Sequence, residues 1–347
     1  ADLAKRAELC LSTGGGIGVD YSVYRASGAV LHGTGGIASG PLAKMQMVNE
    51  QGRGIMQGGS RRSALYASLS HTHGDIYDFI YMKDWHKKPI PGTKISFADA
   101  KLADFNFPCP MDMTNISVNY DTSWLLNYWE TGDYGDTFLA NCKQALSTGE
   151  PGFSFNFFEK ENETLRNACT EVTSEDDSDV CNLGSINLGR IDTLQELKDI
   201  VNLATKFLLC GTLYADLPYA KVKEVREKNR RLGLGIMGLH EWMIKRGHRY
   251  ETTSELHSWF AVYKGVSEST AQSFARSLGV SDSRAIRSVA PTGSIGIIAG
   301  TTTGIEPLVA VAYKRRYLGG GTRWKYQYVI DAAAQRMIEE YGINPDD

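Results

Sequence analysis

Several features are missing from this sequence of 347 residues, and each absence narrows the possibilities. No apolar run reaches the roughly 18 residues of a membrane-spanning helix, so we expect no membrane span. No signal peptide is recognisable, and the six cysteines lack the paired spacings of zinc fingers or disulfide frameworks. We therefore expect a reducing, cytoplasmic compartment. Internal repeats and low-complexity segments are absent as well.

An excess of charge of either sign is also missing. The 37 basic and 40 acidic side chains leave a net charge of −3, and 42% of the residues are apolar, as in an ordinary globular protein. We therefore expect no direct contact with nucleic acid, and any nucleotide contact must come from local basic groups. The length suffices for one large domain or two ordinary ones.

The segment from residue 167 to residue 188 concentrates side chains that carry chemistry. Asn167, Cys169 and Glu171 alternate with other residues, so an extended backbone would present an amide, a thiol and a carboxylate on one face. An amide orients a hydroxyl group, a carboxylate accepts its proton, and a thiol performs nucleophilic or radical chemistry. Cys181 follows twelve residues later and would come close if the chain doubles back.

A structural role for both thiols stays open at this point, because most free cysteines are simply buried apolar groups. A zinc site is disfavoured, since no Cys-x-x-Cys or His-x-x-x-His pair accompanies Cys169 or Cys181.

Glycine-rich segments provide candidate ligand contacts. Residues 12–18 follow a predicted helix over 2–11 and form either a plain helix end or a backbone that approaches a ligand closely. Residues 57–64 join glycines to two arginines, which suits either a solvated surface or a nucleotide-contacting loop. Residues 290–296 form either a tight turn or a helix start that binds an anion, but no Walker motif.

Two weaker patterns occur in the first hundred residues. Residues 33–38 match a loose dinucleotide fingerprint, but no strand run precedes them, so we predict a flexible loop. His71, His73 and Asp75 alternate as in a metal site, although polar loops also collect these residues by chance, and we favour no metal.

The remaining helices and strands are predicted from the periodicity of apolar residues and from residues that begin or end helices. Capping boxes at Thr193–Glu196 and Thr252–Glu255 begin two helices, the second of which ends near Gly279. A third predicted helix covers residues 329–341 and stops at Gly342. Further elements are predicted for two helices, at 41–48 and 75–83, and for two strands, at 115–118 and 151–156, with another helix between the second strand and Asn167.

Taken in order, these motifs resemble the large (catalytic) subunit of ribonucleotide reductase. The resemblance covers residues 14 to 307 and a little beyond, and is greatest to compact phage-type or adenosylcobalamin-type members. It implies an α/β fold, namely a ten-stranded α/β barrel of two five-stranded halves with a central finger loop. It also implies that residues 1–347 form a single catalytic barrel domain, partial because it is truncated at both ends, without an ATP-cone.

The resemblance assigns catalytic roles to four residues. Cys169 becomes a thiyl radical that abstracts the ribose 3′ hydrogen, Glu171 takes the 3′-hydroxyl proton, and Asn167 binds the sugar hydroxyls. Cys181 is one of two thiols that reduce the 2′ carbon, and its partner is expected upstream of residue 1. Ala168 and Thr170 replace the residues that are common at these positions.

The resemblance also assigns binding roles. A glycine turn lies under the substrate ribose, and a turn of small residues binds the substrate phosphates. An arginine and a mobile loop contact an allosteric nucleotide, and the loop transmits its identity to the substrate site. The substrate-binding residues are Gly15, Gly16, Ser294, Ile295 and Gly296, and the effector and specificity residues are Arg25, Gln57 and Arg61.

The implied activity is the reduction of ribonucleoside di- or triphosphates to 2′-deoxyribonucleotides for DNA synthesis. It requires an external radical source, either adenosylcobalamin or a metal-containing small subunit, and a thioredoxin-type dithiol reductant. A deoxynucleoside triphosphate effector, a homodimer and a cytoplasmic location (the host cytoplasm for a viral protein) are also implied. Two alternatives remain: a catalytically silent nucleotide-binding regulator and a thiol-nucleophile hydrolase.

Overall fold

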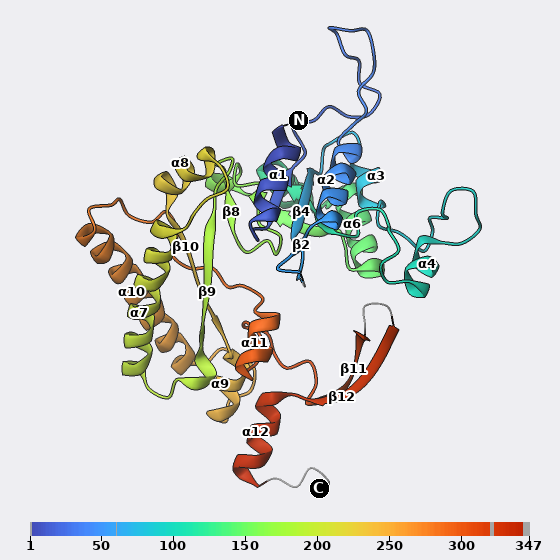
Figure 1. Cartoon of the computed structure of the whole chain (residues 1–347). Helices are drawn as coiled ribbons and strands as arrows, with labels where there is room; N and C mark the ends of the chain where they lie inside the picture. The colour runs from blue at the N-terminus through green and yellow to red at the C-terminus, as the bar shows by residue number, and fades with distance from the viewer. Residues whose placement is uncertain (1, 60, 320–322, 343–347) are drawn as a thin grey trace. The chain divides into compact units, whose positions relative to one another are not determined.

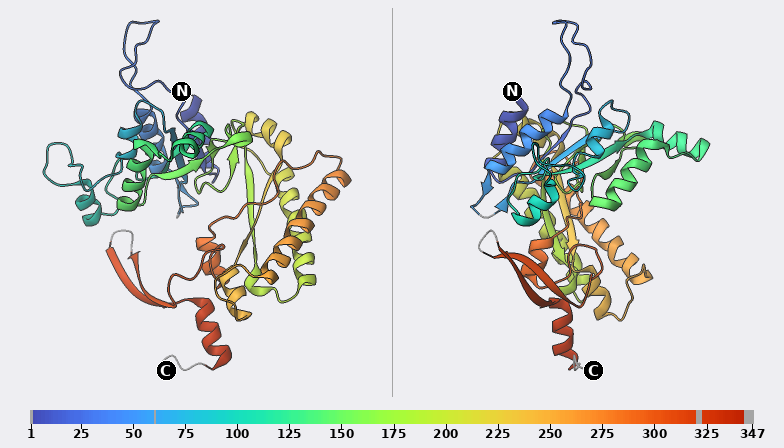
Figure 2. Two further views of the ribbon diagram at one scale, coloured as in Figure 1. Left: turned by 180° about the vertical axis from the view of Figure 1, so that it is seen from behind. Right: turned by 90° about the vertical axis from the view of Figure 1, so that its right-hand side faces the viewer.

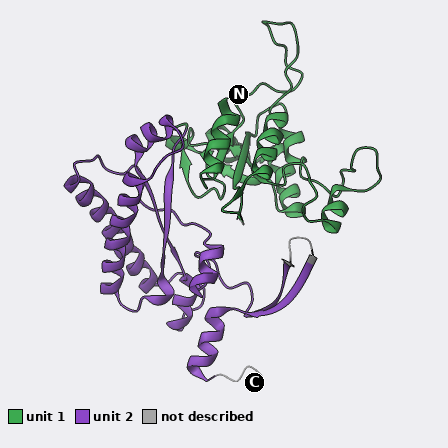
Figure 3. Cartoon of the chain, viewed as in Figure 1, with its two compact units in different colours: residues 1–177 green, residues 178–347 purple. Residues whose placement is uncertain are grey.

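The computed structural model describes residues 2–59, 61–319 and 323–342 (Figure 1). Ser60, which belongs to the glycine-rich segment 57–64, lies outside the described residues. The chain divides into two compact units, residues 1–177 and residues 178–347 (Figure 3). No helix in the described part of the chain has the length and apolar character needed to cross a membrane.

Unit 1 is built on a four-stranded parallel sheet with the order β1-β4-β5-β6. These strands are β1 (Ile17–Asp20), β4 (Leu65–Ser70), β5 (Thr114–Tyr120) and β6 (Gly152–Phe155). Parallel neighbours need long crossover connections, and helices supply them. The crossover helices are α2 (Leu42–Gly54), α3 (Ile76–Ile80), α4 (Phe97–Ala103), α5 (Thr122–Thr131) and α6 (Gly135–Thr148).

The middle of this sheet forms the core of unit 1. All but the last residue of β4 are buried, as expected for a parallel strand covered on both faces. Phe79 and Ile80 of α3 pack with the strand residues Leu69 and Val118. At the start of the chain, α1 (Asp2–Ser12) buries Ala7 and Leu11 against Val48 and Leu65, which confirms the predicted first helix.

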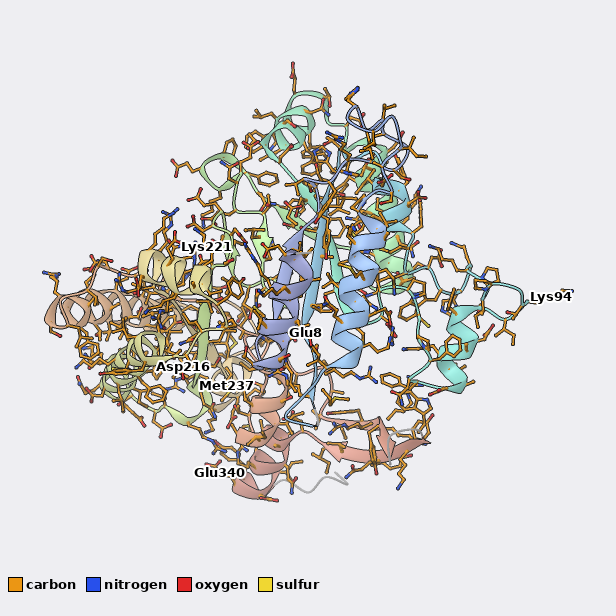
Figure 4. The ribbon with its side chains drawn as sticks, turned by 45° about the horizontal axis from the view of Figure 1, so that its top comes forward. Glu8, Lys94, Asp216, Lys221, Met237 and Glu340 are labelled. Carbon is orange, nitrogen blue, oxygen red and sulfur yellow. The ribbon has the colours of Figure 1, made fainter. Side chains whose placement is uncertain are left out.

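A long loop between α3 and α4 projects from unit 1. Pro89 and Ser96 form an isolated bridge at its base, and Lys94 lies at its outer end (Figure 4). Residues 33–38 also form a loop, tied by a bridge between Val30 and Ile37, as predicted.

Unit 2 contains a second parallel pair, β9 (Cys181–Asn187) and β10 (Arg231–Met237). Every residue of β10 is buried. Figure 2 shows α7 (Leu194–Tyr214) and α10 (Ser254–Ser277) running side by side, and α7 packs on both strands. Trp242 is fully buried and stacks edge-on against Trp259 of α10. The shorter helices are α8 (Ala220–Asn229), α9 (Leu239–Lys245) and α11 (Gly293–Ala299).

A hairpin and a helix end the described chain. β11 (Ala312–Gly319) pairs antiparallel with β12 (Arg323–Ile330), and α12 (Ala332–Tyr341) follows. The helix predicted from residue 329 begins later because β12 continues to Ile330. The Asp331 carboxylate then caps the helix by accepting the N–H groups of Ala333 and Ala334. Gly342 ends the helix in the left-handed conformation, as predicted.

The two predicted capping boxes have different outcomes. Thr193 accepts the N–H of Glu196 and begins α7, as the sequence predicts. The second prediction is wrong by one residue: Thr253, not Thr252, caps α10 by accepting the N–H of Leu256. Glu255 turns away because Arg246 and His248 bind its carboxylate at 3.0 Å each, so a tertiary ion pair replaces the local box.

The α/β prediction is confirmed in both units, because each is built from parallel strands connected by helices. Within the described residues, these parallel strands form sheets of four and two and do not close into a barrel. The ten-stranded barrel and the single domain over residues 1–347 therefore stay predictions.

Candidate functional site

The Asn167–Glu171 segment forms the tip of a short hairpin, and its backbone is not extended. β7 (Leu165–Arg166) pairs antiparallel with β8 (Thr173–Ser174), and a turn closes where Thr170 N–H donates to Asn167 O at 3.1 Å. Thr170 has φ +70°, which is unusual for a β-branched residue. The Asn167 Oδ1 atom accepts the Val172 N–H at 3.0 Å. The extended backbone that would place Asn167, Cys169 and Glu171 on one face is absent, because the Asn167 side chain bonds the Val172 N–H and bends the chain.

Cys169 is exposed at this tip. Partial burial raises the pKa of its thiol, the nearby Glu171 carboxylate raises it further, and the Arg61 guanidinium lowers it. The thiol therefore keeps its proton near neutral pH. A protonated thiol is suited to hydrogen-atom chemistry, whereas a nucleophilic cysteine needs a depressed pKa.

The predicted glycine turn lies directly against the finger hairpin, a name we use for residues 165–174. A Cβ atom on Gly16 would touch the Ala64 and Ala168 side chains. A Cβ atom on Gly18 would overlap the carbonyl oxygen of Arg166, so only glycine allows β1 to approach β7 this closely. Gly15 is exposed and offers its carbonyl oxygen to Gln57.

The specificity segment forms a second hairpin, from β2 (Met56–Gln57) and β3 (Arg61–Arg62). The Gln57 Nε2 group donates to Leu11 O at 3.0 Å and to Gly15 O at 2.8 Å, which ties this hairpin to the glycine turn. Arg61 is exposed, and its charge reaches Cys169. Gln57 is thereby connected to the glycine turn, and Arg61 to the finger hairpin.

Arg25 lies elsewhere in unit 1, on the exposed loop that follows β1. Within residues 2–59, 61–319 and 323–342, its side chain makes no hydrogen bond or ion pair with the β2–β3 hairpin. The structure therefore does not join Arg25 to Gln57 and Arg61.

Cys181 belongs to unit 2, where it is the first residue of β9 and lies in register with Arg231. A Cβ atom on Gly233 of β10 would come within 3.0 Å of the Cys181 sulfur, so a glycine makes room for this thiol. Asp179, two residues earlier, accepts the Arg231 Nε–H at 2.5 Å in a buried ion pair. A charged pair and a continuous strand ladder thus fix the position of Cys181.

The predicted phosphate turn leads into α11. Thr292 adopts φ +52°, and its hydroxyl oxygen accepts the Gly304 N–H at 2.7 Å. Ser294 and Ile295 are exposed in the first turn of the helix. Gly296 is buried, donates its N–H to Thr292 O and packs closely on Thr303, so its backbone donor is used inside the fold.

The His71–Asp75 motif serves the architecture of unit 1. His73 Nε2 lies 2.8 Å from Tyr24 O, and its Nδ1 accepts the Asp75 N–H at 3.0 Å. The Asp75 carboxylate accepts the Ser27 N–H, and His71 contacts Asp121. No group of three or more His, Cys, Asp or Glu side chains suited to a metal occurs in the described part of the chain.

Sequence reasoning missed three residues that hold the finger hairpin. Gly18 provides the close backbone approach, and the Asn115 Nδ2 group donates to Ala168 O at 2.8 Å. Arg166 places its guanidinium at the base of the hairpin. Two features of the sequence point to residues of this kind: a glycine inside a strand, and polar side chains at strand positions where apolar ones are usual.

Known proteins share sequence similarity with this chain over its whole length. The family model "Ribonucleotide reductase, barrel domain" matches residues 1–106, 128–265 and 268–346. A vitamin B12-dependent ribonucleoside-diphosphate reductase of Mycobacterium tuberculosis is 30% identical over 381 residues, which covers 100% of this chain and 53% of that protein.

More distant relatives carry related names. A vitamin B12-dependent ribonucleoside-diphosphate reductase of Thermoplasma acidophilum is 29% identical and covers 91% of this chain and 44% of its own length. The ribonucleoside-diphosphate reductase large subunit of Danio rerio is 28% identical, over a match that covers 73% of this chain and 36% of that protein. The chain thus spans about half the length, or less, of these curated relatives. Its match to the family model over most of its length shows that it belongs to the ribonucleotide reductase barrel-domain family.

Proposed function

We propose that this chain contributes the catalytic barrel of a ribonucleotide reductase, in which Cys169 starts the reduction of a ribonucleotide to a 2′-deoxyribonucleotide. The observation that carries the proposal is the finger hairpin. It exposes a protonated thiol at its tip, beside a carboxylate and against a glycine turn, in a chain of this family. A thiol that keeps its hydrogen atom can lose it to a radical source and regain it from the substrate.

Each step can be assigned to a residue. The Cys169 thiyl radical takes the 3′ hydrogen atom, and the Glu171 carboxylate accepts the 3′-hydroxyl proton. The 2′ hydroxyl takes a proton from one of two thiols and leaves as water. These thiols, Cys181 and a second cysteine, also supply the new 2′ hydrogen and two electrons and become a disulfide. Cys169 then returns the hydrogen atom to the 3′ carbon, and Glu171 returns the proton to the 3′ oxygen. The Asn167 Oδ1 atom is engaged by Val172, so Asn167 would bind the sugar hydroxyls through its Nδ2 group.

We assign the substrate contacts to two turns. Gly15 and Gly16 are exposed, so their backbone can lie under the ribose. The exposed Ser294 and Ile295 at the start of α11 would meet the phosphates. Gly296 would serve this turn through its close packing on Thr303. A ten-stranded barrel with the finger hairpin in its lumen would exclude water from the radical.

We further propose that a deoxynucleoside triphosphate acts through Arg25 and the β2–β3 hairpin in a homodimer. Gln57 provides a physical connection, because it bonds the hairpin to the glycine turn. Two relatives named as vitamin B12-dependent favour adenosylcobalamin as the radical source over a metal-containing small subunit. A thioredoxin-type dithiol would reduce the disulfide, and we expect the reaction to take place in the cytoplasm.

The test is an activity assay with purified protein. The chain, alone and within its parent protein, is given a dithiol, either ribonucleoside diphosphates or triphosphates, and either adenosylcobalamin or a metal-containing small subunit. We expect a 2′-deoxynucleotide that requires one of the two radical sources, and an absorbance spectrum identifies which one binds. Nucleotide binding without any deoxynucleotide under all these conditions would instead support the silent regulator, and ester or amide hydrolysis would support the hydrolase.

A further inference from the structure

The finger hairpin cannot be held by its own strands. β7 and β8 contribute only two residues each, paired as Leu165 with Ser174 and Arg166 with Thr173. A two-stranded hairpin of even ordinary length is marginal in water, so this one depends on contacts to other elements. It also contains a strained residue, since Thr170 has φ +70° and such a backbone persists only where its surroundings enforce it.

The Arg166 guanidinium makes those contacts from the base of the hairpin. Its Nε group donates to Ser154 Oγ at 2.7 Å, and Nη2 donates to Asn156 Oδ1 at 3.1 Å and to Phe155 O at 3.3 Å. Its Nη1 group donates to Thr170 O at 3.2 Å. One planar group therefore joins β6 and the residue after it to the strained end of the turn that carries Cys169.

The acceptors belong to the interior of unit 1. Ser154 is 1% exposed and Asn156 is 2% exposed, and Asn156 Nδ2 donates to Ser154 Oγ at 3.0 Å. Within residues 2–59, 61–319 and 323–342, no carboxylate lies at ion-pair distance from Arg166. Burial lowers the pKa of its guanidinium, and charge interactions with Tyr66 and Glu163 raise it. The four direct acceptors of Arg166 are nevertheless neutral oxygen atoms, so this partly desolvated cation adds little net stability, and its contacts point to a role other than stability.

We propose that Arg166 is a positioning residue that fixes the Asn167–Thr170 turn and thereby aims the Cys169 sulfur. This inference rests on the proposed function only in taking Cys169 as the reacting thiol. Arginine is required because its fork reaches Ser154 and Thr170 together. A lysine has a single ammonium group at the end of a flexible side chain, so it can bond either Ser154 or Thr170 but not both.

The test compares the variants Arg166→Gln and Arg166→Lys with Arg226→Gln in the 347-residue chain. Arg226 is a matched control, because it is buried in unit 2 and donates to the carbonyl oxygens of Thr212 and Ala215 at 2.9 and 3.0 Å. Alkylation of Cys169 by iodoacetamide and deuterium exchange of the Thr170 and Val172 amides are followed by mass spectrometry. The melting temperature is recorded for each variant.

We expect Arg166→Gln to accelerate both the alkylation of Cys169 and the exchange of the two amides, and Arg166→Lys to restore only part of the protection. Arg226→Gln should lower the melting temperature and leave both readouts unchanged. In the assembled enzyme, Arg166→Gln should lower kcat by about 10- to 100-fold with little change in KM, the scale expected for a misplaced reacting group.

Unchanged alkylation and exchange in Arg166→Gln, or an equal change in Arg226→Gln, would overturn the proposal. If Arg166→Gln does not fold, Ser154→Ala removes the acceptor that Arg166 Nε shares with Asn156 Nδ2, leaves the other three Arg166 bonds in place, and should give the same changes in smaller measure. Its failure to do so would also count as refutation. If the parent enzyme forms no deoxynucleotide, the proposed function fails while the alkylation and exchange results still decide the role of Arg166.

Discussion

The two thiols expected to take part in the reaction are supported in different ways. Cys169, in unit 1, is exposed on a turn between strands of two residues, and side chains from other elements hold that turn. Cys181, in unit 2, begins a seven-residue strand whose backbone pairs in register with β10 along its whole length. A thiol on a turn can be re-aimed by its neighbours, whereas a thiol in a strand ladder is fixed by the fold.

The comparison extends to the glycines beside each thiol. Gly18 brings the backbone of β1 against the backbone of β7, and Gly233 leaves room for the Cys181 and Leu183 side chains. The contact at Gly18 is with a carbonyl oxygen, which moves only with its strand. The contacts at Gly233 include side-chain atoms that can rotate. The finger hairpin is therefore held by its surroundings at rigid points, and β9 by its own ladder.

The largest effect should come from removing the thiols. Cys169→Ala should abolish both deoxynucleotide formation and the loss of the substrate's 3′ hydrogen isotope to water, because no radical forms. Cys181→Ala should abolish deoxynucleotide formation but retain isotope loss, since Cys169 still exchanges its hydrogen with solvent. Nucleotide binding is the control and should persist in both variants. Turnover by Cys169→Ala above a few per cent of the wild-type rate would show that the role is wrongly assigned.

The glycines should give the next largest effect. Gly18→Ala should lower the free energy of unfolding by about 3 kcal/mol, the upper end for overpacking, because its new methyl group meets the Arg166 carbonyl oxygen. Gly233→Ala should cost less, about 1 kcal/mol, because its shortest contact is the Leu183 side chain, which can give way, and the nearest backbone atom, Asn182 O, lies at 3.0 Å. Urea unfolding measures both values. An equal loss of unfolding free energy in the two variants would mean that the backbone of β7 moves aside as easily as a side chain does, and would contradict the comparison.

Helix caps in the two units should differ more modestly. Thr193→Ala removes the cap of the 21-residue helix α7, whose inner face is in the core, and should cost about 1 kcal/mol of global stability. Ser96→Ala removes the cap of α4, which buries no residue, so it should fray that helix locally and leave the global unfolding curve in place. Hydrogen exchange in α4 detects the local effect, and a shift of the global midpoint would contradict it.

The smallest effects concern the acidity of Cys169. Glu171→Gln removes a negative charge that raises the pKa of this thiol, so the pKa should fall and alkylation at pH 8 should become faster. Arg61→Gln removes a positive charge that lowers the same pKa, so alkylation should become slower. The pH dependence of the alkylation rate measures both, with Cys181 as the internal reference. Shifts of the same sign would refute the assigned electrostatics.

Much of this protein was determined by local sequence. The first helix, the cap at Thr193 and the stop at Gly342 follow from apolar periodicity and from residues that satisfy helix ends. The order of the motifs also predicted the family. These features depend on neighbours a few residues apart, which the sequence displays directly.

The geometry of the site was decided by contacts between distant residues. Asn167, Cys169 and Glu171 do not alternate on a strand, because the chain bends where the Asn167 side chain accepts the Val172 N–H. Arg166 reaches β6, and Glu255 leaves its predicted capping box for Arg246 and His248. Hydrogen bonds and ion pairs of this kind join groups that only the folded chain brings together. The sequence therefore predicted which residues carry the chemistry, and the tertiary structure decided how the chain holds each of them.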